Sequence, residues 1–309
     1  MRVGIINFTE VKPTSTIASN AIALCVHERF ENAVLMDTPQ RCTLAHQKGK
    51  PFDLLVVVNG VFGFCKFRQQ VVDMVAAHER IVWAGNDFDL CPVPSQLQKV
   101  FREKKHLEYW CAYHMDTPCT GYPKGKYHYV NWNALAWKPL AHKQRKLCEG
   151  LMYYGAFRAD RLPYFEKYLH PCSPYRIYCS PPSSKQAHKW FTFHGGMHFF
   201  NANPPAFLET LGSFRTSIYI EDTYTHEQFC SPANRFYELV SARVLVLFDV
   251  SCQNTFDTAG ISIGDYLVNG SKDLNMMLKA APSLLEKQQQ DFATQRDKNP
   301  TPWETVLPC

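Results

Sequence analysis

The amino-acid sequence predicts an α/β protein made of two successive units, each with a parallel sheet, and a long C-terminal helix. Three observations predict this fold class. Apolar runs such as VGIINF at 3–8 and LLVVVNG at 54–60 are continuous, which is typical of parallel strands covered on both faces. Helical patterns separate these runs. The alternation becomes irregular after about residue 92 and restarts near residue 148, which indicates a second unit.

In the first unit, expected over 1–147, strands and helices follow one another from the first residue. The predicted strands are 3–8, 33–37, 54–60 and 81–87, and the predicted helices are 15–30, with Ser15 or Thr16 as cap, and about 67–78. The stretch 92–147 is rich in aromatic residues, His, Lys and Pro. We interpret it as an irregular remainder of the first domain followed by a linker.

The second unit, expected over 148–270, repeats the alternation. Its predicted strands are 151–157, 175–180, 190–195, 217–222 and 244–249, and its predicted helices are 160–169, 205–213 and 231–241. A last helix is expected over about 272–297, in a segment 271–309 that packs back towards the N-terminal domain. Ligands of such units bind beyond the carboxyl ends of the strands, so a cleft between two facing units is the expected site.

Composition sets few limits on function. The 309 residues suffice for two domains, and 46% hydrophobic with 20% charged residues predicts a packed core. The net charge is 33 − 28 = +5, which is compatible with a polyanionic partner without requiring one. Twelve cysteines include no CxxC pair, which favours reduced thiols in a cytosolic protein. No signal peptide or membrane-spanning run is predicted.

The segment SPANRFYELV at 231–240 combines helix-start signals with two charges. Ser231 can cap a helix, and Pro232 suits its first position. The apolar stripe that this helix should bury consists of Phe236, Leu239 and Val240. Arg235 and Glu238 lie beside it, where the helix N-terminus favours anions. An arginine there suits a diphosphate, and the glutamate can bind a sugar diol. A surface ion pair is the alternative.

Three predicted strands end in chemically informative turns. In YYGAFRADR, Gly155 allows a ligand to approach the backbone, and Arg158 and Arg161 can bind phosphate oxygens; arginines placed for solubility are the alternative. EDTY offers Glu221, Asp222 and Tyr224. In NDFD, Asp87 is the best-placed general base, although it can also simply cap a turn, and Asp89 competes with it.

Two further motifs are less specific. HGGMH at 194–198 resembles a metal pair, but two glycines break the helix that would align the histidines, so an exposed turn, near a uracil ring, is favoured. Basic and aromatic residues mix in FCKFR and FREKKH. Such mixtures suit a nucleic-acid backbone, although ordinary loops explain them as well. The candidate DNA contacts are Lys66, Arg68, Lys104 and Lys105.

With these residues in place, the chain resembles the bacteriophage DNA β-glucosyltransferases. The motifs that carry the resemblance occur in one order, and they include MRVGIINF, IVWAGNDFDLCP, LMYYGAFRADR, SIYIEDTY and NRFYELVSARVLVLFD. The resemblance implies a GT-B fold with two Rossmann-like domains facing a central cleft. It implies sugar transfer from a UDP-sugar to 5-hydroxymethylcytosine, flipped out of duplex DNA, in the cytoplasm of an infected bacterial host. A monomer is expected, and Mg²⁺ can assist without being required.

The resemblance also assigns roles to single residues. Asp87 matches the catalytic base, and Glu238 matches the glutamate on the ribose hydroxyls. The positions that match donor-binding residues around the diphosphate and uracil are Gly155, Ala156, Arg158, Arg161, Met197, Tyr224 and Arg235. Ala156 departs from the family, which has a serine there.

A second departure concerns the sugar. The family places a glutamate in the first strand–helix loop, where this chain has Ser15 and Thr16. We therefore favour a sugar other than glucose, with arabinose as the leading candidate and glucose as the alternative. Two other functions stay open: a GT-B enzyme acting on a small molecule, lipid or polysaccharide, and a module that binds UDP-sugar or DNA without turnover. Salt-dependent retention on duplex DNA would separate the DNA enzyme from the former.

Overall fold

A computed structural model describes residues 1–7, 18–36, 52–58, 60–85, 94–111, 126–130, 147–155, 159–170, 175–180, 197–200, 207–221 and 232–298. For some of these residues, including Met197, it describes the backbone alone. Two compact units divide between Ala136 and Trp137, where the sequence predicts a boundary at 147 and 148. Each unit is described by itself.

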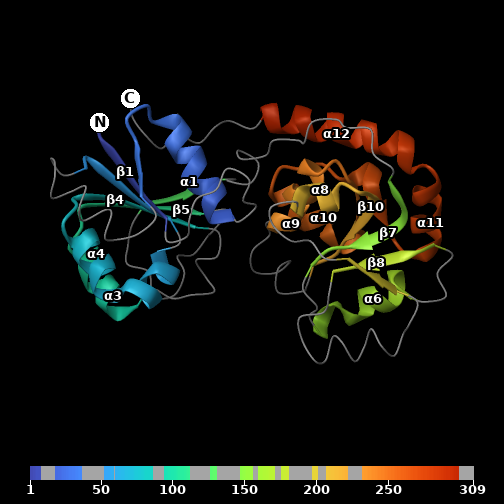
Figure 1. The fold of residues 1–309 in the computed structure, drawn as a ribbon, viewed down its shortest axis with the longest axis horizontal. Helices are drawn as coiled ribbons and strands as arrows, with labels where there is room; N and C mark the ends of the chain where they lie inside the picture. Colours follow the sequence, from blue (N-terminus) through green and yellow to red (C-terminus); the bar gives the residue numbers. More distant parts are fainter. Residues whose placement is uncertain are drawn as a thin grey trace. The chain divides into compact units, whose positions relative to one another are not determined.

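The first unit contains one parallel sheet of six strands, ordered β2-β1-β3-β4-β5-β6. The strands are β1 (Val3–Asn7), β2 (Val34–Met36), β3 (Leu54–Val58), β4 (Arg80–Gly85), β5 (His106–Cys111) and β6 (Lys126–Tyr129). The helices are α1 (Ala18–Arg29), α3 (Gly60–Ala76) and α4 (Ser95–Arg102). Helix α1 lies on one face of the sheet, and α3 and α4 lie on the other (Figure 1).

Burial on both faces explains the continuous apolar runs. Every residue of β1 and of β3 is buried, so neither strand needs the alternation that a half-exposed strand shows. The buried aromatic residues Trp83, Tyr109 and Trp110 extend this core along β4 and β5.

The structure corrects the interpretation of 92–147 as irregular, because α4, β5 and β6 all lie within it. Polar residues hide these strands from a search for apolar runs. Glu108 in the middle of β5 lies 3.3 Å from His128 Nε2 on β6 and accepts a 3.3 Å hydrogen bond from Trp110 Nε1. Burial acts to raise the pKa of Glu108, but these contacts together with the charge of Lys126 lower it, so the carboxylate form is stabilised within the sheet.

The second unit contains another parallel sheet of six strands, ordered β12-β11-β10-β7-β8-β9. The strands are β7 (Cys148–Tyr153), β8 (Ile177–Cys179), β9 (Met197–Phe199), β10 (Phe214–Tyr219), β11 (Leu245–Asp249) and β12 (Leu267–Val268). The helices are α6 (Leu162–Tyr168), α8 (Phe207–Leu211), α9 (Asn234–Ser241), α10 (Gln253–Thr258), α11 (Ser271–Lys279) and α12 (Ala281–Lys298), with a 3-10 turn, η1 (Ala159–Arg161), before α6 and two more, η3 (Val250–Cys252) and η4 (Gly264–Tyr266), around α10.

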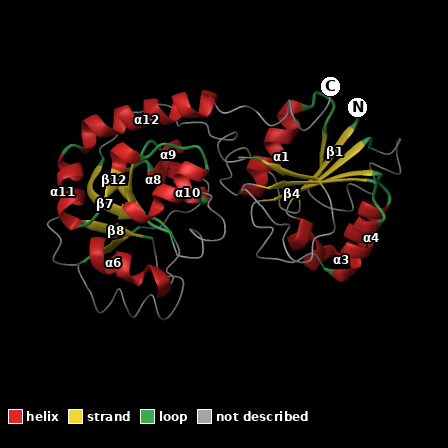
Figure 2. Ribbon diagram, turned by 180° about the vertical axis from the view of Figure 1, so that it is seen from behind, coloured by secondary structure: helices red, strands yellow, loops and turns green. Residues whose placement is uncertain are grey.

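The strand order reverses between β7 and β10. From β7 the chain builds outwards through β8 and β9, then returns to β10 on the other side of β7 and builds outwards through β11 and β12. Helix α6 lies on one face of this sheet, and α9 and α12 lie on the opposite face (Figure 2). In doubly wound sheets such a reversal opens a crevice at the carboxyl ends of the two central strands, where ligands bind.

The predicted single C-terminal helix is two helices, α11 and α12, which separate at Ala280. The proline at position 282 explains the break, because it has no N–H group to continue the hydrogen bonding of α11. Helix α12 packs on β10 and β11 of the second unit. Packing of 271–309 towards the first domain stays a prediction.

Two general features concern the described part of the chain. No helix there is both long and apolar enough to cross a membrane. The cysteines described as free thiols are Cys25, Cys65, Cys148, Cys179 and Cys252.

Candidate active site

A polar cluster lies at the reversal point of the second sheet. Gly155 follows β7, Glu221 follows β10, and Arg235 stands in the first turn of α9. Glu221 is 1% exposed, and its Oε2 lies 2.5 Å from Nη2 of Arg235 and 3.2 Å from Nη2 of Arg161. One buried carboxylate therefore binds two guanidinium groups.

Arg235 is held from several sides. Its Nη2 also donates a 2.5 Å hydrogen bond to the carbonyl oxygen of Ile220, and its guanidinium lies 4.8 Å from the ring centre of Tyr219. Burial acts most strongly on the pKa of Arg235 and lowers it, but Glu221 and the neighbouring Tyr219, Tyr153 and Cys252 together raise it above the ordinary value. Arg235 therefore stays positively charged. Arg235 Nε is buried and has no hydrogen-bond acceptor among the described residues.

Arg161 is only 2% exposed, which is less than its expected role on a diphosphate suggests. Besides Glu221, it reaches Tyr153, because Nη1 donates a 3.3 Å hydrogen bond to that phenol. The sequence prediction brings Arg161 and Arg235 together at one site, and the structure does the same through Glu221. Whether Arg161 also contacts a diphosphate stays a prediction.

Gly155 closes the cluster on the β7 side. Its φ is +155°, and a Cβ atom there would lie 2.9 Å from Oη of Tyr153 and 3.2 Å from Nη1 of Arg235. Ser180 at the end of β8 fixes this turn, because its hydroxyl accepts from Gly155 N at 3.3 Å and donates to Gly155 O at 3.0 Å. Only glycine leaves the backbone open here.

Glu238 lies one turn further along α9. Burial raises its pKa to about 7, while a hydrogen bond from Tyr154 and the charge of Arg235 act in the opposite direction. With a pKa close to neutral pH, Glu238 can ionise beside Arg235, and its carboxylate can then accept hydrogen bonds from a diol.

The predicted apolar stripe of α9 positions these charges. Phe236, Leu239 and Val240 are all buried, as predicted. Phe236 packs against Phe248 and Phe256, with ring centroids 5.9 Å and 4.9 Å away. This packing fixes the rotation of the helix, so that Arg235 points to Glu221.

The predicted start of α9 is wrong. Its N-cap is Ala233, which offers no side-chain cap, so Pro232 precedes the helix. Ser231, the predicted cap, lies outside the described residues. The phenol of Tyr219 accepts a 2.8 Å hydrogen bond from Ala233 N instead. Tyr219 also donates to Glu221 Oε1, so the start of α9 is tied to the same carboxylate.

Sequence reasoning noticed Glu221 at a strand end but gave it no role, and it missed Tyr153 and Tyr219. The signal was present, because Tyr153 and Tyr219 are the last residues of the two strands beside the reversal point and Glu221 lies two residues after the second of them. Of the other predicted residues, Ser15, Thr16, Asp87, Ala156, Arg158 and Tyr224 lie outside the described residues, as does strand 190–195. The turn expected at 194–198 is wrong from Met197 on, because β9 begins there.

Two of the predicted DNA contacts lie on α3. Lys66 and Arg68 are exposed and flank a kink at Phe67, whose φ of −133° and ψ of 46° are not helical. Arg68 Nε donates a 2.7 Å hydrogen bond to Gln96 Oε1 at the start of α4. Both side chains remain accessible to a partner.

The other two predicted contacts are Lys104 and Lys105. They lie in the loop between α4 and β5, just before the N-terminal end of β5. Lys104 donates a 2.7 Å hydrogen bond to the carbonyl of Ala76, the last residue of α3, and burial lowers its pKa. Lys104 therefore closes the end of a helix, whereas Lys105 is exposed. DNA contact by either stays a prediction.

No group of three or more His, Cys, Asp or Glu side chains in the described part of the chain could hold a metal ion. No protein-family model matches the sequence. A search of curated proteins likewise finds no significant match.

The two doubly wound parallel sheets in series, with the C-terminal helices, define a GT-B-like fold. Similar solved structures include that of T4 phage β-glucosyltransferase with its UDP-glucose substrate. The TM-score is 0.66 at 13% identity, over 96% of both chains. A second structure of T4 phage β-glucosyltransferase gives a TM-score of 0.61 at 13% identity, over 96% of this chain and 98% of that one. An α-glucosyltransferase with UDP and a DNA 13-mer containing a HMU base gives 0.56 at 10% identity, over 96% and 93%. At these identities the comparisons show the fold.

Proposed function

We propose that this protein is an inverting glycosyltransferase that moves a sugar from a UDP-sugar to 5-hydroxymethylcytosine in phage duplex DNA, and so protects the DNA from host nucleases. One observation carries the proposal. At the reversal point of the second sheet, the guanidiniums of Arg161 and Arg235 share one carboxylate, that of Glu221. Two cations against one anion in a buried setting favour an anionic ligand such as a diphosphate.

Three further observations support a UDP-sugar as this ligand. The buried Nε of Arg235 is a donor for which the described residues provide no acceptor, and a phosphate oxygen would supply one. Glu238 stands one turn further along α9 than Arg235, where the ribose hydroxyls are expected from the sequence. A structure with the same fold binds UDP-glucose, and another binds UDP together with DNA.

The proposed reaction is a single displacement. Asp87 removes the proton of the hydroxymethyl group as its oxygen attacks the anomeric carbon, and UDP leaves from the opposite face. Arg158, Arg161, Arg235 and the helix starts stabilise the charge that develops on the diphosphate. The acceptor base is flipped out of the duplex. A single displacement with attack opposite the departing UDP inverts the configuration of the anomeric carbon.

The variant Asp87→Ala tests the role of the base. Sugar transfer should fall by about 10²–10⁴-fold, the contribution of positioned general-base catalysis, while UDP affinity stays at the wild-type value. Single-turnover transfer and calorimetric UDP titration on the same preparation measure the two quantities. Loss of UDP affinity instead would remove Asp87 from the proposed role.

The sugar is tested with a donor panel. Arabinose is the favoured sugar because Ser15 and Thr16 replace the glutamate that the resembling family places near glucose. DNA with and without 5-hydroxymethylcytosine is incubated with UDP-arabinose or UDP-glucose, and its nucleosides are weighed by mass spectrometry. We expect a pentose added to the hydroxymethylated base alone. Efficient transfer of glucose, with none of arabinose, would overturn the choice of sugar, and no product from any donor would overturn the function. A parallel series with added Mg²⁺ shows whether the metal assists.

A further inference from the structure

We infer that Glu221 is a positioning residue of the donor site, which fixes Arg235 for the diphosphate and is itself fixed by Arg161 and Tyr219; this inference rests on the proposed function. The two carboxylate oxygens of Glu221 bind different partners. Oε2 binds both arginines, and Oε1 accepts the phenol proton of Tyr219. A carboxylate with partners on each oxygen has a single orientation available to it.

The orientation of Arg235 follows from that of Glu221. The carboxylate and the Ile220 carbonyl bind Nη2 at one corner of the guanidinium, and the Tyr219 ring lies 4.8 Å from Cζ. Nη1 then points towards Gly155, where the backbone lies open. The side chain of Arg235 is therefore already ordered before a ligand binds. This order lowers the entropic cost of binding.

Arg161 acts through the carboxylate in this arrangement. Arg161 is 2% exposed, and it donates hydrogen bonds from Nη2 to Glu221 at 3.2 Å and from Nη1 to Tyr153 at 3.3 Å. It approaches Glu221 from η1, whereas Arg235 approaches from α9. Turn η1 and helix α9 are thereby tied to one oxygen atom of Glu221, just after β10. Arg161 then stabilises the charge of the diphosphate through its place in this cluster, by positioning Glu221 and Arg235.

The sign of a mutational effect separates positioning from simple charge. A carboxylate next to a diphosphate site repels the ligand, so a role limited to its charge predicts tighter UDP binding when Glu221 is neutralised. The positioning role predicts weaker binding. The variant Glu221→Gln keeps the size of the side chain and removes the charge that holds both arginines.

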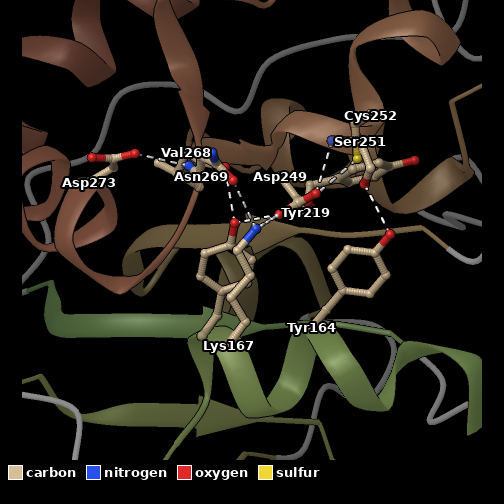
Figure 3. A network of polar contacts seen from close by, with 10 residues as sticks. Tyr164, Lys167, Tyr219, Asp249, Ser251, Cys252, Val268, Asn269 and Asp273 are labelled. Carbon is tan, nitrogen blue, oxygen red and sulfur yellow. Dashed lines mark hydrogen bonds and ion pairs between the residues drawn. The ribbon is translucent and has the colours of Figure 1, made fainter.

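A matched control lies at the end of the neighbouring strand. Asp249 is 2% exposed and ends β11 as part of a second cluster, which Figure 3 shows with Lys167, Tyr164 and Ser251. Lys167 Nζ lies 2.7 Å from its Oδ2, and Ser251 N donates to its Oδ1 at 2.9 Å. Burial opposes its ionisation, but these bonds hold its pKa below the ordinary value. No arginine of the donor site contacts Asp249 among the interactions described for it.

The experiment titrates UDP calorimetrically into the full-length wild type, Glu221→Gln and Asp249→Asn, and follows the thermal unfolding of each. We expect Glu221→Gln to lose at least about tenfold in UDP affinity, since it removes charge-assisted bonds from a ligand-binding group. Asp249→Asn should unfold at a lower temperature yet bind UDP as the wild type does. Equal losses of affinity in both variants would mean that Glu221 is merely structural.

The remaining outcomes are also decisive. Unchanged or tighter UDP binding by Glu221→Gln overturns the inference and leaves the proposed function standing. A wild type that binds no UDP overturns the proposed function and the inference with it. If Glu221→Gln does not fold, Tyr219→Phe decides, because it removes the phenol from Oε1 and keeps the ring beside Arg235. It also removes the acceptor of Ala233 N, so its thermal unfolding is followed as well. A severalfold loss of UDP affinity in that variant supports positioning, and no loss contradicts it.

Discussion

Glu238 makes the stability of the unliganded protein depend on pH. Its pKa in the folded protein is about 7, above the ordinary value of 4.5, so the folded state holds a proton that the unfolded chain loses first. The stability that this proton provides is complete below the ordinary pKa and is lost as the pH rises towards and through the folded pKa.

The variant Glu238→Gln tests this linkage. Its glutamine cannot lose a proton. As the pH rises from about 5 to about 8, the free energy of unfolding of the wild type should therefore fall relative to that of the variant. Denaturant unfolding of both proteins across that range, in the absence of UDP, measures the difference. A difference that does not change with pH would show that Glu238 titrates normally.

Gly155 allows a residue-scale test of the crevice. In Gly155→Ala the new methyl group would lie 3.2 Å from Arg235 Nη1 and 2.9 Å from Tyr153 Oη, so the arginine must move. We expect UDP affinity to fall by about tenfold or more. Gly270→Ala is the control, because Gly270 has a φ of +137° and no atom within 4 Å of a Cβ. Similar affinity losses in both variants would point to backbone strain alone.

At the scale of elements, α12 stabilises the second sheet with an amide. Val246 N donates to Gln288 Oε1 at 2.8 Å, and Gln288 Nε2 donates to Val246 O at 2.7 Å, so the side chain pairs with β11 as a further strand would. Gln295, seven residues later on the same helix, makes the same pair of bonds with Ser262. Two glutamines of α12 thus pair with backbone groups of the second unit, one on β11 and one in the segment between α10 and η4.

Gln288→Ala should therefore destabilise the protein by about 2–4 kcal/mol, because two buried backbone groups lose their partners. Gln290→Ala, at an exposed position of the same helix, should change stability by less than about 0.5 kcal/mol. Urea denaturation of the two variants compares them. Equal stability would mean that water satisfies Val246 in place of the glutamine.

The sequence predicts best those elements in which burial determines the spacing of the apolar residues. The stripe of Phe236, Leu239 and Val240 predicts α9 because all three side chains are buried on one face of the helix. The first residue of α9 could not be predicted in this way, since its N–H partner, the phenol of Tyr219, comes from another element. Strand β5 was missed for a related reason, because the partner of Glu108 lies on β6.

At the scale of the whole molecule, the alternation of strands and helices was enough to predict two parallel sheets. The comparisons confirm this GT-B-like fold. The assembly of the site was only partly predictable. Arg161 and Glu221 are 60 residues apart, and they meet because the strand order reverses between β7 and β10, which no local pattern records.

The measurement that tests the account most directly is a calorimetric titration of UDP and of uridine into the wild type and Arg235→Met. We predict that UDP binds the wild type, and that the variant loses UDP affinity by about thirtyfold or more because its guanidinium no longer meets the diphosphate. Uridine, which has no diphosphate, should bind both proteins with the same weaker affinity. UDP affinity that is equal in the two proteins, or no tighter than that of uridine, would contradict the account.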